Sequence, residues 1–131
     1  MIVLDTHVWI WWISNPEYLS DKAREAIDLA VADDMLYLSS MSAWETAMLV
    51  KRGRLHLTLD ISAWVAGSEA LAFLHFVPVS NGIAIKSVYL PGIFHDDPAD
   101  RIIVATALTI GASLVTKDEK IQNYSHVRTI W

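Results

Sequence analysis

The stretch HDDPADRIIVATA, residues 95–107, guides the interpretation of the whole chain. Three aspartates stand in its first half, and a run of small and branched apolar residues follows them. The apolar run predicts a buried helix from Pro98 to Ile110, ended by Gly111. Carboxylates at the mouth of a buried helix are costly because each one disfavours ionisation of the next. They call for an explanation from the rest of the chain.

Short apolar segments before and after this stretch predict the strands of a sheet. They alternate with segments of helical periodicity, and each is continuously apolar, as in a sheet covered on both faces. We therefore predict one α/β domain over residues 1–131, with three α/β/α layers and a central, mainly parallel sheet. The expected strands are Ile2–Leu4, Met35–Leu38, Leu74–Val79, Ser113–Val115 and His126–Ile130, and the expected helices are Thr6–Ile13, one capped by Ser20, Ser42 to about Arg52, Asp60–Ala72, Asn81–Leu90 and Pro98–Ile110.

Composition limits the classes of protein to which the chain belongs. Hydrophobic residues make up 53% of the 131 residues, which excludes a disordered chain. The longest apolar run, Val8–Ile13, is too short to cross a bilayer, so we expect no membrane association. We expect no signal peptide either, because the N-terminus lacks a basic region and carries Asp5. Cysteine is absent, which removes disulfides and thiolate zinc sites and fits a reducing cytoplasm.

The formal net charge of −5 means that the chain lacks a large basic footprint for nucleic acid. If the protein handles nucleic acid, something other than net charge must hold the phosphates. A bound divalent cation would serve.

Four carboxylates stand where the expected strands end, although they are far apart in the sequence. Asp5 ends the first strand, Glu45 lies one turn into the helix after the second, Asp100 lies in the first turn of the long helix, and Asp118 follows the strand at Leu114. Ligands of parallel α/β sheets bind beyond the carboxyl ends of the strands. A hard divalent cation would relieve the repulsion between the acids, and all-oxygen ligands favour Mg²⁺ or Mn²⁺ over zinc.

Each acid also has a structural explanation. Ser42 and Glu45 have the spacing of a capping box, and Asp97 before a proline has the position of an N-cap. Asp5 and Asp118 each precede a segment that they would cap. Independent caps need not converge at one edge of a sheet, so the shared position of the four acids favours a common site.

Four blocks together resemble the PIN domain family, and within it the VapC toxins of type II toxin–antitoxin pairs. IVLDTH alone would be weak evidence, whereas the pattern HxDPxDRxIxAxA combined with the other blocks is specific. The resemblance spans nearly the whole chain in the family's order. The blocks are IVLDTHVWIWW (2–12), SSMSAWETAMLVKRGRL (39–55), LPGIFHDDPADRIIVATA (90–107) and LVTKDEKIQNY (114–124).

The resemblance implies a metal-dependent endoribonuclease that hydrolyses RNA phosphodiester bonds. It implies that Asp5, Glu45, Asp100 and Asp118 hold one or two Mg²⁺ or Mn²⁺ ions and form the catalytic site. It also implies a cognate antitoxin that holds the toxin inactive, and a homodimer.

Further roles follow from position within these blocks. Asp97 is an extra acid typical of the HxDPxDR subgroup, with a supporting or capping role, and Thr116 corresponds to a hydroxyl residue beside the last acid. Ala99 departs from the family, which usually has an aromatic there, and affects packing rather than the acids. Arg101 and Lys117 lie near the site and are candidates for RNA phosphates. A solvated charge or ion pair is the alternative for Lys117, and a structural role is the alternative for Arg101.

Trp9, Trp11 and Trp12 make one predicted helix apolar on two faces. We predict that part of this surface binds a partner, either a second copy or an antitoxin segment, because tryptophans often anchor interfaces. The alternative is that these rings are a deep core. His95 is a further ambiguous residue, since it could position an acid or a phosphate, but a loop histidine is more often structural.

Two other functions remain open from the sequence. One is a PIN-type nuclease that processes RNA or DNA without an antitoxin, which a neighbouring gene for a small DNA-binding protein would argue against. The other is a non-catalytic binding module that uses the tryptophan surface. Retention of all four acids argues against a module, which has no need of them.

Overall fold

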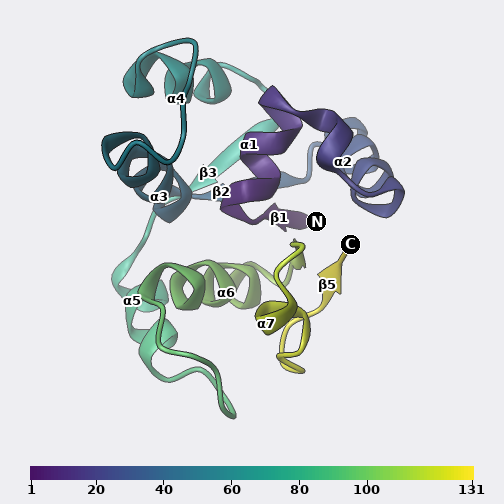
Figure 1. The fold of residues 1–131 in the computed structure, drawn as a ribbon. Coiled ribbons are helices and arrows are strands. Elements are labelled where there is room, and N and C mark those ends of the chain that lie inside the picture. Colours follow the sequence, from purple (N-terminus) through teal and green to yellow (C-terminus); the bar gives the residue numbers. More distant parts are fainter.

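The computed structural model describes residues 1–131 and contains a five-stranded sheet between two layers of helices (Figure 1). The strand order is β3-β2-β1-β4-β5, and every neighbouring pair is parallel. The predicted three-layer α/β/α fold is therefore confirmed. The strands are β1 (Ile2–Leu4), β2 (Leu36–Ser39), β3 (Leu74–Val77), β4 (Ser113–Val115) and β5 (Thr129–Ile130).

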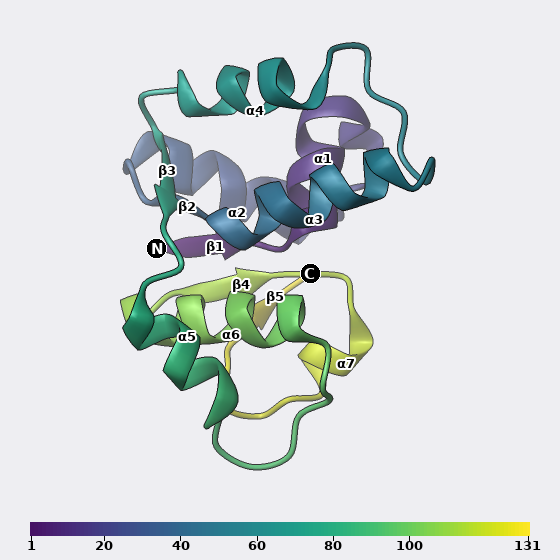
Figure 2. The ribbon, with the colours of Figure 1, turned by 90° about the vertical axis from the view of Figure 1, so that its left-hand side faces the viewer.

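The helices divide between the two faces of the sheet, as two perpendicular views show (Figures 1 and 2). None of them is long and apolar enough to cross a membrane. One layer contains α1 (Thr6–Ser14), the 3₁₀ turn η1 (Pro16–Tyr18), α2 (Asp21–Ala32), α3 (Ser40–Lys51) and α4 (Ile61–Glu69). The other contains α5 (Asn81–Val88), α6 (Pro98–Ile110) and α7 (Glu119–Gln122).

Alternate side chains of β1 supply the two hydrophobic cores of the molecule. Ile2 and Leu4 pack with the layer of α1, α2 and α4, whereas Val3 packs with the layer of α5 and α6. Buried helix α6 is held close to the sheet because its inner face has small and branched residues, including Ala105 and Ala107, that are fully enclosed. Each large aliphatic side chain that is fully buried in these cores, such as Ile103, stabilises the fold by about 1.5–3 kcal/mol.

Several element boundaries differ from the sequence prediction, and α4, for example, ends at Glu69 rather than at residue 72. Helix α3 begins at Ser40, and its N-cap is Ser39, whose hydroxyl accepts a hydrogen bond from the Met41 N–H at 3.1 Å. The predicted capping box is therefore wrong, because Ser42 lies inside the helix. Strand β3 ends at Val77 rather than residue 79, since Pro78 has no N–H for the ladder. The last strand covers only residues 129–130.

The order of the strands creates a crevice at the carboxyl edge of the sheet. From β1 the chain builds outward through β2 to β3, then returns to place β4 on the opposite side of β1. The connections after β1 and β4 therefore lead away in opposite directions. Such a switch point is where parallel α/β sheets bind ligands, and the segments that begin at Asp5 and Thr116 start there.

Candidate acidic active site

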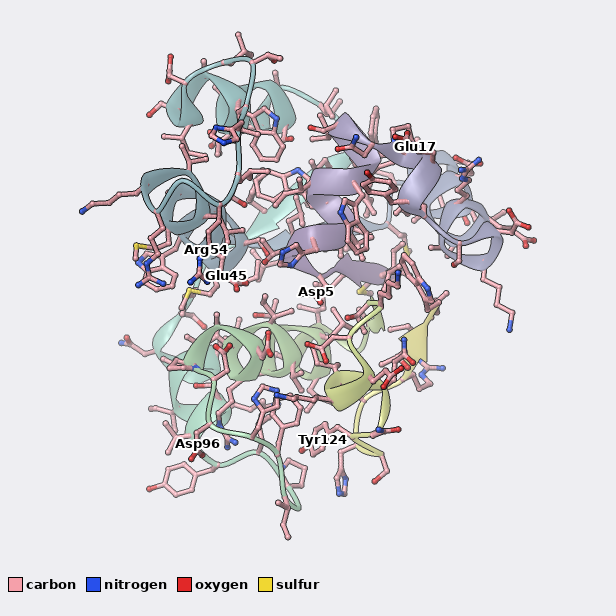
Figure 3. All side chains as sticks on the ribbon, viewed as in Figure 1. Asp5, Glu17, Glu45, Arg54, Asp96 and Tyr124 are labelled. Atoms are coloured by element: carbon pink, nitrogen blue, oxygen red, sulfur yellow. The ribbon has the colours of Figure 1, made fainter.

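A cavity of about 580 Å³ opens at this crevice. The structure brings all four predicted acids into its walls, from four separate parts of the chain. Figure 3 shows Asp5 and Glu45 in the space between the two helical layers, with Asp96 well away from them. The six carboxylates that line the cavity are Asp5, Glu45, Asp97, Asp100, Asp118 and Glu119.

Asp5 is the most enclosed of the predicted acids, at 8% exposed. It is the N-cap of α1, and its Oδ1 accepts a hydrogen bond from the Thr6 N–H at 2.8 Å. Its Oδ2 accepts a hydrogen bond from the Thr116 hydroxyl at 2.7 Å. The Thr116 oxygen in turn accepts the Asp118 N–H at 3.0 Å, so this threonine joins two of the acids. Thr116 therefore ties the Asp5 carboxyl to the segment of Asp118, and its supporting role at a metal site stays a prediction.

Glu45 projects from α3 toward Asp5 and is fixed by a residue that sequence reasoning missed. The Thr6 Oγ1 lies 2.6 Å from Glu45 Oε1 and 2.9 Å from Ser42 Oγ. A hydroxyl has one proton, and the shorter contact to a charged acceptor takes it, so Ser42 donates to Thr6. The only signal in the sequence was the place of Thr6 directly after Asp5.

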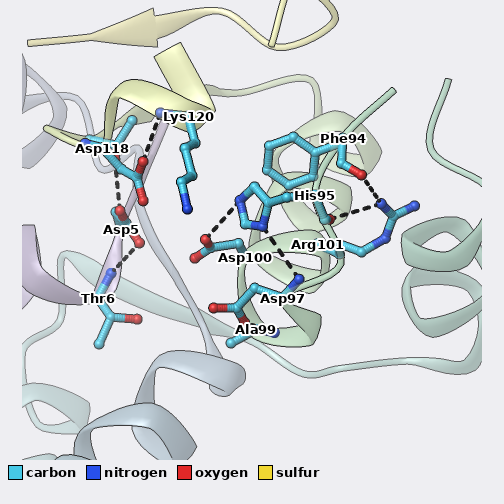
Figure 4. A network of polar contacts seen from close by, with 11 residues as sticks. Asp5, Thr6, Phe94, His95, Asp97, Ala99, Asp100, Arg101, Asp118 and Lys120 are labelled. Atoms are coloured by element: carbon cyan, nitrogen blue, oxygen red, sulfur yellow. Dashed lines mark hydrogen bonds and ion pairs between the residues drawn. The ribbon is translucent and has the colours of Figure 1, made fainter. Parts of the chain in front are cut away.

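The start of α6 supplies two more acids, shown in Figure 4. Asp97 is the N-cap and accepts the Ala99 N–H at 3.0 Å, so its predicted capping role is confirmed. Asp100 lies in the first turn with its side chain 14% exposed, and its Oδ2 is 3.1 Å from His95 Nε2. That contact is an ion-pair distance without hydrogen-bond geometry, and the buried Nε2 has no hydrogen-bond partner in the protein.

Crowding and burial change the protonation of these carboxyls. Burial, reinforced by the negative charges of the surrounding acids, raises the pKa of Asp100 from 3.8 to about 8. Burial also raises the pKa of Asp5, against the hydrogen bonds from Thr116 and Thr6 that lower it. The pKa of Glu45 rises for the same first reason, with the Thr6 hydroxyl opposing it. Without a cation, the site therefore does not keep all of these carboxyl groups ionised at once.

The chemistry of the donors fits a divalent metal ion. Every candidate ligand is a carboxylate oxygen, which suits Mg²⁺ or Mn²⁺, and a cation would relieve the repulsion that raises the pKa of Asp100. No three acidic or histidine side chains are already arranged as a set of ligands.

The Arg101 side chain binds backbone carbonyl groups and does not line the cavity. Its guanidinium closes the segment between α5 and α6, so the structural alternative for this residue is favoured over RNA binding. The acceptors are the carbonyl oxygens of Ser87, Val88, Phe94 and His95, at 2.8 to 3.1 Å.

Lys117 lies at the rim of the cavity, as its predicted role requires. It is exposed and within ion-pair distance of no carboxylate. Its Nζ lies 5.9 Å from the centre of the Trp11 ring, which also lines the cavity. A cation over an aromatic face at this distance is attracted to the ring, so Lys117 is held beside the acids.

The three tryptophans of α1 divide between core and surface. Trp9 is 0% exposed, packs against Trp64 with the ring centres 4.5 Å apart, and donates a hydrogen bond to the Ser68 hydroxyl. The prediction that Trp9 binds a partner is therefore wrong, because the ring is part of the core. Trp11 and Trp12 are half-buried, and their predicted partner role stays a prediction.

Comparison with known sequences gives two matches over nearly the whole chain. The sequence model of the PIN domain matches residues 2–127. The chain is also 36% identical over 132 residues to Ribonuclease VapC22 from Mycobacterium tuberculosis, covering 99% of this chain and 98% of that protein. The similarity therefore extends well beyond the acidic motifs.

Solved structures have the same fold. VapBC2 from Rickettsia felis, bound to a DNA fragment from its promoter, matches with a TM-score of 0.72 and 17% identity, covering 98% of this chain and 97% of that chain. FitAcB from Neisseria gonorrhoeae matches with a TM-score of 0.70 and 20% identity, covering 98% and 96%. At these identities the likeness shows the arrangement of the sheet and helices.

Proposed function

The chain belongs to the PIN domain family, and from that membership we propose that it is a metal-dependent endoribonuclease acting as a VapC-like toxin. The observation that carries the proposal is the meeting of Asp5, Glu45, Asp100 and Asp118 in one cavity at the switch point of the sheet. Helix capping explains Asp5 and Asp118 individually but not why Glu45 and Asp100 face the same space.

In this proposal the four acids hold one or two Mg²⁺ or Mn²⁺ ions. When bound, such an ion lowers the pKa of water and stabilises negative charge on a phosphate. Thr116 and Thr6 keep Asp5 and Glu45 oriented through their hydroxyls. In the metal-free protein Asp100 holds a proton at neutral pH, because its pKa is about 8, and it gives this proton up as the site becomes less negative.

The negative net charge of the chain would not attract RNA to the site. The net charge is −5, so the substrate's phosphates depend on the metal and on a few local cations. Lys117 is one of these, since it lies at the cavity with no carboxylate partner. A backbone contact of this kind positions RNA without reading its sequence.

Two partner proposals rest on the relatives. The structural neighbours include VapBC2 and other toxin–antitoxin complexes, which supports a cognate antitoxin that keeps this chain inactive.

We also propose that two copies of the chain form a homodimer. The exposed apolar side chains Ile85 and Val88 on α5, with Tyr89 directly after it, provide a surface that a second copy would cover. The place of action would be the cytoplasm, in keeping with the absence of cysteine.

The test is cleavage by the purified chain, free of antitoxin, of cellular RNA and of DNA of matched length. Reactions would contain Mg²⁺, Mn²⁺ or EDTA. We expect internal cleavage of RNA with either metal and none with EDTA. Cleavage of DNA at the same rate would favour a general processing nuclease, and cleavage that persists in EDTA would overturn the metal-dependent mechanism.

A further inference from the structure

A second groove lies beside the acidic cavity, between α3 and the start of α6. Its volume is about 440 Å³, and it shares Glu45 and Asp97 with the cavity. One wall contains Met41, Trp44 and Met48, which are spaced three and four residues apart and so lie on one face of α3. The groove is therefore continuous with the place where the acids gather.

Trp44 is the unusual residue of this groove. Its side chain is 55% exposed, whereas Trp9 and Trp64 are enclosed in the core. It stacks on no other ring, unlike Trp11 and Trp12, which pack against Trp131 and Phe73. An indole left open beside a candidate active site has a free face for a flat ligand.

One lining residue of the groove, Arg52, is positively charged. Arg52 has neither an ion pair nor a hydrogen bond to another side chain. It belongs to the segment KRGR, residues 51–54, which concentrates basic charge in a chain whose net charge is −5. Unpartnered guanidinium groups suit phosphate oxygens.

We propose that this groove is a nucleobase subsite for the RNA strand, next to the bond that the acidic cavity cleaves. The base stacks on Trp44, and an adjoining phosphate meets Arg52. The proposal rests on the proposed ribonuclease function and adds a requirement to it. Only an unpaired base has a face free to stack on a side chain, so the groove selects single-stranded positions.

The lining favours a nucleotide over an apolar protein segment. Along α3, Met48 and Leu49 lie between Glu45 and Arg52, so apolar lining residues separate the acid shared with the cavity from the basic Arg52. A nucleotide has the same division into a flat apolar base and a phosphate. An apolar segment of a protein would cover Trp44 but leave the charge of Arg52 without a partner.

The test is binding of two labelled probes, measured by fluorescence anisotropy in EDTA so that no cleavage occurs. One probe is a short single-stranded RNA of mixed sequence, and the other is a ribose-phosphate strand of equal length without bases. We expect the wild-type protein to bind the RNA roughly tenfold more tightly than the baseless strand. Trp44→Ala should abolish this preference, and Trp44→Phe should retain most of it.

Two controls separate stacking from charge and from general loss of an exposed apolar side chain. Arg52→Gln should weaken binding of both probes alike and reduce the salt dependence. Ile93→Ala shortens a 98% exposed side chain that lines neither the groove nor the cavity, and it should change neither affinity. A wild-type protein that binds both probes equally, or a Trp44→Ala variant that keeps the preference, would overturn the subsite. Loss of self-association in Trp44→Ala with RNA binding intact would assign the groove to a protein interface instead.

Failure of the subsite is distinguishable from failure of the ribonuclease proposal. Metal-dependent cleavage of RNA by a protein that binds both probes equally would overturn the subsite alone. Base-dependent binding in EDTA, with no cleavage of RNA when Mg²⁺ or Mn²⁺ is supplied, would overturn the ribonuclease proposal but not the binding of a base at Trp44.

Discussion

Asp100 is a single residue whose burial makes the folded protein less stable at the pH values where its carboxyl would ionise. The carboxyl titrates near pH 4 in an unfolded chain, but its pKa in the folded, metal-free protein is about 8. Between these values the folded protein holds a proton that the unfolded chain has released. The free energy of unfolding therefore falls as the pH rises from about 4 to about 8.

We predict that Asp100→Asn removes much of the stability loss that occurs as the pH rises. In EDTA, the variant should melt at a higher temperature than the wild type near pH 9, and the difference should shrink toward pH 5. Thermal melts followed by circular dichroism at several pH values would check this. A variant that is less stable than the wild type at every pH would contradict the electrostatic interpretation.

Thr6 is a residue whose role is visible only in the folded chain. We predict that Thr6→Val, which keeps the shape but loses the hydroxyl 2.6 Å from Glu45, weakens Mg²⁺ binding about 10- to 100-fold. Calorimetric titration with Mg²⁺ would measure it. Thr109→Val is the matched control, because that hydroxyl bonds only to a carbonyl of its own helix, and an equal effect from both variants would refute the special role of Thr6.

The sequence located the acids because each follows a strand or opens a helix. It could not locate Thr6, or the contact of Thr116 with Asp5, because both depend on where α1, α3 and β4 meet. Ser42 was assigned a capping role from spacing alone, and the structure gives it a contact with Thr6 instead. Side-chain partners more than about thirty residues apart are set by tertiary packing, which local patterns do not encode.

At the scale of elements, Arg101 holds the segment between α5 and α6 in place. We predict that Arg101→Gln lowers the free energy of unfolding by about 3 kcal/mol, because several charged hydrogen bonds to carbonyls are lost. Denaturant unfolding would measure it, with the exposed Arg128→Gln as the control. A stable variant with weakened RNA binding would restore the phosphate-binding role.

The boundaries of the elements were predictable where a residue imposes them. Pro98 and Gly111 bracket α6 as expected, and Gly111 adopts the left-handed conformation at φ 71° that ends the helix. The shorter β3 also has a local cause in Pro78. Helix α7 is only four residues long, too short for periodicity to reveal, although its cap at Asp118 was foreseen.

At the scale of the whole molecule, the order of the strands unites the acids. Apolar patterns predicted a parallel sheet, but they do not say which strands are neighbours. The pairing of β1 with β4, through Ile2 with Ser113 and Leu4 with Val115, brings Asp5 beside the segment of Asp118. That pairing joins residues over a hundred positions apart and follows from packing on both faces of the sheet.

The mutual repulsion of the acids also predicts that the whole fold responds to metal. We predict that Mg²⁺ raises the melting temperature of the wild type, since an ion that binds only the folded state stabilises it by about 2.7 kcal/mol at a hundredfold excess over Kd. Scanning calorimetry with and without Mg²⁺ would show it. An equal rise in Asp5→Asn, or no rise in the wild type, would count against metal binding by this cluster.

The central claim is that Asp5, Glu45, Asp100 and Asp118 form one metal-dependent ribonuclease site. The most direct measurement is the rate of Mg²⁺-dependent RNA cleavage by Asp5→Asn, Glu45→Gln, Asp100→Asn and Asp118→Asn, each with its folding checked. Asp96→Asn is the matched control, because that exposed acid lies in the same segment but outside the cavity. We predict a loss of at least about 100-fold in each of the four variants and a near wild-type rate for the control. Full activity in Asp5→Asn or Asp100→Asn would contradict the claim.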